Sequence, residues 1–210
     1  MDLSAIILAG DYSRKFEQDS GTLEVSNKPL IRHVIEAVKA IADEIIIVTD
    51  SQERAATYAK ILGSNVTFVV DSGTVQSFLM GALKGFQKAQ GQFSLLLPFD
   101  APFICPEVIK LLFELCPGRS AVIPRWPNAQ VEPLPAVYNT QKALEAATIA
   151  LCDVEADLSD LVVQLKGVRY VSTLVIQELD PELKTFFRVK TPVDFKKAIL
   201  LGKFKNKKTK

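Results

Sequence analysis

A glycine and two basic residues follow the first apolar run of the chain, and together they are suited to binding an anion. The run from residue 5 leads into Ala9 and Gly10, and Arg14 and Lys15 come shortly afterwards. Because Gly10 has no Cβ, backbone N–H groups can approach a phosphate closely there, and the two side chains can neutralise its charge. The stretch matches neither GxGxxG nor GxxxxGKS/T, which excludes the two commonest phosphate loops. The alternative is that Gly10 serves only a tight turn between a strand and a helix.

Aspartates follow other apolar runs and offer oxygen ligands. In LLLPFDAPFICPE, residues 95–107, Asp100 ends one run, and Asp71 ends an earlier one. A carboxylate beside a triphosphate is what Mg²⁺ prefers, because this small cation binds oxygen and keeps phosphates and waters in its shell. We therefore predict Asp100 as a magnesium ligand. The alternative is a loop or helix-capping aspartate.

The elements that must position these residues alternate between two patterns. Short runs that are apolar on both faces occupy 5–10, 44–50, 66–71 and 93–100, and amphipathic segments lie near 30–42, 52–62, 75–89 and 106–115. Strands buried on both faces are typical of parallel sheets, and their alternation with helices predicts a doubly wound α/β fold. In such sheets, ligands bind beyond the carboxyl ends of the strands. The glycine and the aspartates are therefore expected at one edge.

The second half of the chain predicts further strands at 121–125, 134–138, 167–173 and 186–190, with helices near 141–151 and 158–166. A last helix begins at Thr191-Pro192, because proline is accepted in a first helical turn. No linker or internal repeat interrupts the pattern. We predict one domain over 1–202, followed by a flexible basic tail at 203–210.

Composition narrows the classes of function. The 210 residues are 48% hydrophobic with a net charge of +1, which favours neither nucleic acid nor an anionic membrane as a partner. The three cysteines are widely spaced and only one histidine is present, which argues against a zinc site or a disulfide framework. No segment approaches the roughly 20 apolar residues of a membrane span. A cytoplasmic location is expected.

Four motifs in order resemble one enzyme family. ILAGDYSRKFEQDSGTLEVSNKPLIRHV, residues 7–34, resembles the LAGG…KPL signature of the molybdenum cofactor guanylyltransferases, within the nucleotidyltransferase superfamily. LPFDAPFI, EPLPAVYN and FFRVKTPVDF are similar to the family's CDxP, QPLxAxY and NTPxD segments. The resemblance implies a Rossmann-like, mostly parallel mixed sheet of the nucleotide-diphospho-sugar transferase type, in three α/β/α layers.

The resemblance also implies an activity and its participants. The family transfers GMP from GTP to molybdopterin with Mg²⁺, releases pyrophosphate, and works with an accessory protein that delivers the cofactor. Carried over residue by residue, Leu8, Ala9 and Gly10 line the nucleotide, Arg14 faces its phosphates, and Asp71 lies in its pocket. Asp100 would hold the metal, and with Arg14 it would be catalytic.

The chain departs from the family at charged and close-packed positions. Asp11 and Phe16 replace glycines, and Ser20 replaces the phosphate-binding lysine. Val48, Arg188 and Lys190 replace asparagines, and SGTVQS at 72–77 replaces a GPLAG loop. Lys15, Lys28, Arg188 and Lys190 are candidate compensating cations. In the 72–77 loop, polar groups could read a base edge, or Thr74 and Ser77 could cap the next helix.

Two other functions remain open at this point. The chain could be a non-catalytic descendant of the fold that binds a nucleotide or a pterin, because its departures fall on the charged loop. It could also be a nucleotidyltransferase that uses another base or another phosphorylated acceptor.

Overall fold

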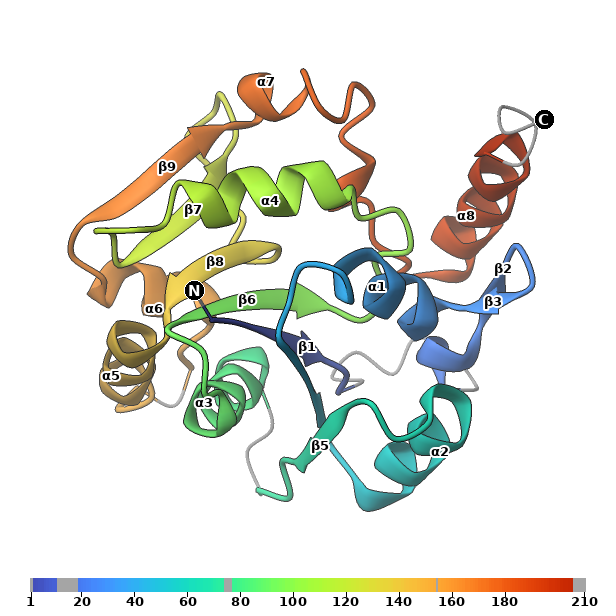
Figure 1. The fold of residues 1–210 in the computed structure, drawn as a ribbon, viewed down its shortest axis with the longest axis horizontal. Coiled ribbons are helices and arrows are strands. Elements are labelled where there is room, and N and C mark those ends of the chain that lie inside the picture. The colour runs from blue at the N-terminus through green and yellow to red at the C-terminus, as the bar shows by residue number, and fades with distance from the viewer. Residues whose placement is uncertain (1, 11–18, 74–76, 154, 206–210) are drawn as a thin grey trace.

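The computed structural model describes residues 2–10, 19–73, 77–153 and 155–205. Within these residues, a seven-stranded sheet has the order β5-β4-β1-β6-β8-β7-β9 (Figure 1). Its strands are β1 (Leu3–Leu8), β4 (Glu44–Thr49), β5 (Thr67–Val70), β6 (Phe93–Pro98), β7 (Ala121–Arg125), β8 (Ala136–Asn139) and β9 (Val168–Ser172). The first four in the order β5-β4-β1-β6 are mutually parallel, β8 is antiparallel to β6 and β7, and β9 is parallel to β7. A two-stranded ribbon joins β2 (Glu24–Val25) to β3 (Lys28–Pro29).

Helices cover both faces of the sheet. On one face lie α1 (Leu30–Val38), α2 (Gln52–Leu62), α4 (Pro106–Glu114) and the short α7 (Thr173–Ile176), and on the other lie α3 (Phe78–Lys88), α5 (Thr140–Ala150) and α6 (Leu158–Gln164). Helix α8 (Pro192–Lys205) packs on the β2–β3 ribbon, and 3₁₀ turns occupy Ser20–Thr22 and Lys184–Phe186.

Strand β1 shows why the strands are apolar throughout. Successive side chains of a strand point to opposite faces. Ala5 and Ile7 enter the core beneath α1 and α4, whereas Ile6 and Leu8 enter the core beneath α3 and α5, and all four are fully buried. The predicted three-layer α/β/α fold with a mostly parallel mixed sheet is therefore confirmed.

The strand order has a switch point between β1 and β6. The chain runs from β1 outward through β4 to β5, and then returns to place β6 on the other side of β1. Leu8 pairs with Pro98 at the ends of these parallel strands, so Gly10 and Asp100 lie side by side just beyond them. Ligands of doubly wound proteins bind at such a crevice. The expected meeting of glycine and aspartate at one edge is confirmed.

Several predicted elements differ from the structure. The strand predicted at 186–190 is wrong: a 3₁₀ turn ends at Phe186, Phe187 N–H bonds back to the Lys184 carbonyl, and Val189 N–H bonds the Asp100 carbonyl, so no strand ladder forms. The β2–β3 ribbon and α7 were not predicted. Helix α8 continues past residue 202 to Lys205, and 206–210 lie outside the described residues. Across the described chain, no helix combines the length and the apolar character that crossing a membrane requires.

Candidate functional site

Asp100 is held by an arginine from the far end of the chain. Arg188 donates from Nε to Oδ1 at 2.7 Å and from Nη2 to Oδ2 at 3.1 Å, a bidentate pair. The Asp100 side chain is 7% exposed and the Arg188 side chain 17%. The guanidinium carbon also lies 5.4 Å from the ring centroid of Phe78, a cation–π distance. Arg188, one of the predicted compensating cations, is thus hydrogen-bonded to Asp100, the predicted metal ligand.

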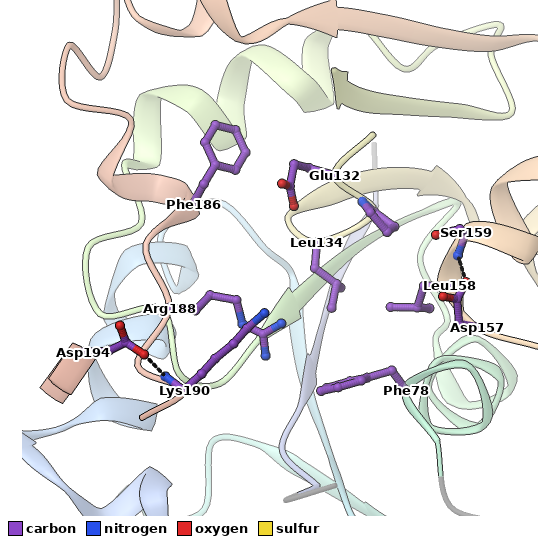
Figure 2. Close-up of a pocket in the computed structure, with 11 residues that line it drawn as sticks. Phe78, Glu132, Leu134, Asp157, Leu158, Ser159, Phe186, Arg188, Lys190 and Asp194 are labelled. Carbon is purple, nitrogen blue, oxygen red and sulfur yellow. Dashed lines mark hydrogen bonds between the residues drawn. The ribbon is translucent and has the colours of Figure 1, made fainter. Parts of the chain in front are cut away.

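Arg188 also lines a pocket of about 510 Å³ at this edge of the sheet. Lys190 lines it too, and Figure 2 shows both basic side chains extending from the C-terminal segment toward Leu134 and Phe78. The remaining lining residues are Glu132, Pro133, Asp157, Leu158, Ser159, Phe186 and Asp194. The volume lies within the range of small-molecule sites. The pocket therefore offers two cations, apolar walls and an acidic far side.

Motif residues at the pocket have local structural roles. In TPVD, Asp194 accepts from the Thr191 hydroxyl at 2.8 Å and from Lys190 N–H at 3.3 Å, and Thr191 Oγ1 accepts from Asp194 N–H at 3.2 Å, which closes the first turn of α8. Ser77 caps α3 by accepting from Met80 N–H at 3.1 Å. The capping alternative holds for Ser77, whereas Thr74 lies outside the described residues.

The predicted nucleotide-binding residues follow the ends of neighbouring parallel strands. The side chains of Leu8 and Ala9 are fully buried in the two cores, so only their backbone could face a ligand. Asp71 follows β5 and is 1% exposed, with Oδ1 accepting from Gly73 N–H at 3.4 Å. Adjacent strands lie about 4.8 Å apart, so three strand spacings separate Asp71 from Asp100 by about 14 Å. This span suits an extended nucleotide.

The other predicted cations do not line the Arg188 pocket among the described residues, except Lys190. Arg14 and Lys15 fall outside the described residues, as do Asp11 and Phe16. Lys28 bonds Glu36 at 2.5 Å and lines a separate pocket beside Pro102 and Gly202. That contact with Lys28 lowers the pKa of Glu36 from its usual value. Lys28 therefore does not line the Arg188 pocket, and its role as a compensating cation stays a prediction.

A charged network beside this edge was not predicted. Arg54, on the first turn of α2, contacts Asp19 at 2.9 Å and Asp50 at 2.5 Å. Asp19 also accepts from the Tyr58 hydroxyl at 2.6 Å and from Gly21 N–H at 2.9 Å. Burial, followed by the charge of Asp19, raises the pKa of Tyr58. The i,i+4 spacing of Asp50 and Arg54 was the available signal for this network, which fixes the Ser20–Thr22 turn against α2.

A magnesium ion does not fit Asp100 as the structure stands. Both carboxylate oxygens already accept from Arg188, and in the described residues no group of three or more His, Cys, Asp or Glu is arranged to hold a metal ion. Mg²⁺ demands near-octahedral oxygen ligands, and the guanidinium takes the carboxylate's inner positions. Metal binding at Asp100 stays a prediction that the pairing argues against.

Comparison with known proteins identifies the family. The model of the MobA-like NTP transferase domain matches residues 5–166. A probable molybdenum cofactor guanylyltransferase of Methanosarcina mazei is 31% identical over 201 residues, covering 93% of this chain and 89% of that protein. One from Pelotomaculum thermopropionicum is 31% identical over 205 residues, covering 96% and 94%. The domain that the family model matches ends at residue 166, before Arg188 and Lys190.

Solved structures agree on the fold. Molybdopterin-guanine dinucleotide biosynthesis protein A from Archaeoglobus fulgidus superposes with a TM-score of 0.79 at 22% identity, covering 94% of this chain and 97% of that one. A nucleotidyl transferase from Methanothermobacter thermautotrophicus gives a TM-score of 0.76 at 16% identity, with 97% and 99% covered. The chain therefore belongs to the molybdenum cofactor guanylyltransferase family of nucleotidyltransferases, which carries the MobA-like NTP transferase domain.

Proposed function

We propose that this protein transfers GMP from GTP to molybdopterin and releases pyrophosphate. The observation that carries the proposal is the pocket with Arg188 and Lys190, which adjoins Asp100 at the β1–β6 switch point. Two cations suit a phosphorylated acceptor, and Phe78, Leu134 and Phe186 offer apolar area to a flat ring. The guanylyltransferase names of the relatives support the base and the acceptor.

The chemistry needs no nucleophile from the protein. An oxygen of the acceptor phosphate attacks the α-phosphorus of GTP and forms the new P–O bond. The bond from the α-phosphorus to its bridging oxygen breaks, and pyrophosphate leaves with the electron pair. Because the attacking phosphate is already ionised, no base is required. The task of the protein is to align the two phosphates and to offset the charge on the leaving group.

Lys190 and Arg188 are our proposed phosphate contacts among the described residues, and Gly10 is our proposed site of close backbone approach. Asp100 orients Arg188 through the bidentate pair. We propose Mg²⁺ as the ion that accompanies GTP, and we assign no step to it because Asp100 is already paired. Leu8, Ala9, Asp71, Arg14, Lys15 and Lys28 remain proposed nucleotide-site residues. Three free thiols in the described chain support a proposed cytoplasmic location.

Lys190→Ala tests the pocket. Loss of one charge-assisted hydrogen bond of about 1.5–3 kcal/mol should weaken binding of GTP or of the acceptor by roughly one to two decades. The measurement is calorimetric titration with GTP, CTP and ATP, followed by pyrophosphate release after molybdopterin is added. Lys110→Ala, which removes an equal charge from an exposed position on α4, is the matched control. Equal effects of the two variants would exclude the pocket as the site.

A second function is favoured by the Asp100–Arg188 pair itself. If catalysis requires Asp100 to bind a metal ion, a permanent guanidinium partner would prevent turnover. The protein would then bind a nucleotide or a pterin without catalysing transfer. Binding without pyrophosphate release would select this non-catalytic function. Release with CTP or ATP, or with another phosphorylated acceptor, would instead show a different specificity.

A further inference from the structure

The carboxylate of Asp100 is enclosed on several sides. Its two oxygens accept from Nε and Nη2 of Arg188, and it is almost fully buried. The next residue, Val189, donates its backbone N–H to the Asp100 carbonyl at 2.9 Å and is 1% exposed. Backbone and side chain of one short segment therefore bind the same aspartate, which limits the freedom of the guanidinium to leave.

The guanidinium has a second restraint. It lies over the ring of Phe78, which begins α3, while its Nε and Nη2 bond the carboxylate. Arginine keeps its charge at every pH that proteins tolerate, and its planar fork matches a carboxylate with two parallel bonds. The partner of Asp100 is thus a permanent, oriented positive charge.

A divalent cation and this guanidinium compete for the same carboxylate. A metal bound to Asp100 would lie within a few ångströms of the arginine charge, inside a buried site where charges are weakly screened. The described residues supply no cluster of further acidic or histidine ligands that would compensate. Occupation by one cation therefore opposes occupation by the other.

We infer that Arg188 takes the place of a divalent cation at Asp100, so that this site is closed to metal and presents a guanidinium to phosphate. The first half concerns the protein without nucleotide. The second half rests on the proposed function, and predicts that nucleotide binding survives removal of divalent metal. Without Arg188, Asp100 becomes available as a metal ligand.

The first half is tested by titrating the protein with Mn²⁺ alone. Binding is measured from the electron paramagnetic resonance signal of the Mn²⁺ that remains free. Wild type and Asp100→Asn should bind Mn²⁺ equally, because Asp100 is already occupied. Arg188→Asn should bind roughly tenfold more tightly than the Arg188→Asn/Asp100→Asn double variant, since one released carboxylate contributes a charge-assisted contact. Circular dichroism checks that each variant is folded.

Two results would overturn the first half. One is Mn²⁺ binding by wild type that Asp100→Asn abolishes, a comparison that does not need any Arg188 variant to fold. The other is a folded Arg188→Asn protein that gains no Asp100-dependent binding. Arg188→Lys, which keeps the charge but loses the fork, should fall between wild type and Arg188→Asn.

The second half is tested by titrating GTP in EDTA and in Mg²⁺. We expect the two dissociation constants of wild type for GTP to agree within about threefold. In EDTA, Arg188→Asn should bind GTP roughly tenfold or more weakly than wild type, because it loses one charge-assisted contact. A wild-type protein that binds GTP only with Mg²⁺ would refute this half. If GTP does not bind under either condition, the proposed function fails, while the Mn²⁺ result still decides whether Arg188 occupies Asp100.

Discussion

Replacing Tyr58 with Phe removes one hydrogen bond to a charged acceptor and little else. Tyr58 is fully buried on α2, and its hydroxyl donates to Asp19 Oδ1 at 2.6 Å. The same oxygen accepts from Gly21 N–H, so the bond connects α2 to the Ser20–Thr22 turn. The substitution keeps the ring that packs against the core.

The expected cost follows from the charge of the acceptor. A hydrogen bond to a charged group contributes about 1.5–3 kcal/mol, compared with about 0.5–1.5 kcal/mol for a neutral pair. For a chain of this size, each kcal/mol lowers the melting temperature by roughly 2–4 °C, so we expect a decrease of roughly 3–12 °C. Tyr138→Phe is the matched control, because Tyr138 is equally buried but donates to the neutral Pro133 carbonyl at 2.9 Å.

The assay is urea unfolding of wild type, the two tyrosine variants, Asp19→Ala and the Tyr58→Phe/Asp19→Ala pair. The double-mutant cycle should give a coupling energy of about 1.5–3 kcal/mol between Tyr58 and Asp19, since the interaction is direct. If Tyr58→Phe costs as much in the Asp19→Ala background as in wild type, the bond contributes nothing and the reasoning is refuted. Equal costs for Tyr58→Phe and Tyr138→Phe would refute the role of the charge.

The pH dependence has a definite sign. Burial, followed by the negative charge of Asp19, raises the pKa of Tyr58 in the folded protein. The unfolded chain releases this proton near pH 10, so above that pH the unfolded state binds fewer protons and folding stability decreases. The contribution is complete below about pH 10 and is lost as pH rises. The stability of wild type should therefore fall more steeply than that of Tyr58→Phe, by about 1.4 kcal/mol per pH unit.

Two further predictions concern packing and thiols. Gly85→Ala places a Cβ 2.3 Å from Cγ2 of the fully buried Ile6, so it should cost about 1–3 kcal/mol in urea unfolding through overpacking, and an unchanged midpoint would contradict the close approach of α3 to β1. With a thiol reagent at neutral pH, exposed Cys152 should react first and half-buried Cys105, whose pKa burial raises, more slowly. Buried Cys116, whose pKa burial raises to about 12, should react only on unfolding, and early labelling of Cys116 found by mass spectrometry would count against this order.

The parallel half of the sheet could be predicted because its strands are buried on both faces. The runs at 44–50 and 93–100 correspond to β4 and β6 with ends shifted by one or two residues. The topology of parallel strands then required Gly10 and Asp100 to meet at one edge. Segment 186–190 was wrongly predicted as a strand because its alternating pattern is typical of one. In the structure, Arg188 bonds Asp100 and Val189 packs in a small separate core.

The partner of Asp100 could not be predicted from local sequence. Arg188 lies 88 positions away, and only the folded chain brings the C-terminal segment back across the end of β6. The sequence identified Arg188 as a candidate compensating cation without showing which group it contacts. Arg54 carried a local signal, its spacing from Asp50, but its bond to Asp19 also depends on tertiary contacts.

The return of the C-terminal segment to Asp100 has a consequence for biosynthesis. A domain generally folds as a unit, and its chain is synthesised from the N-terminus. The segments that form β1 to β6 are made early, whereas the side chain that neutralises Asp100 is made late. A nascent or truncated chain that ends before Arg188 would lack the cation that neutralises Asp100 at the switch point, so the pocket can be completed only after the C-terminal segment has been made.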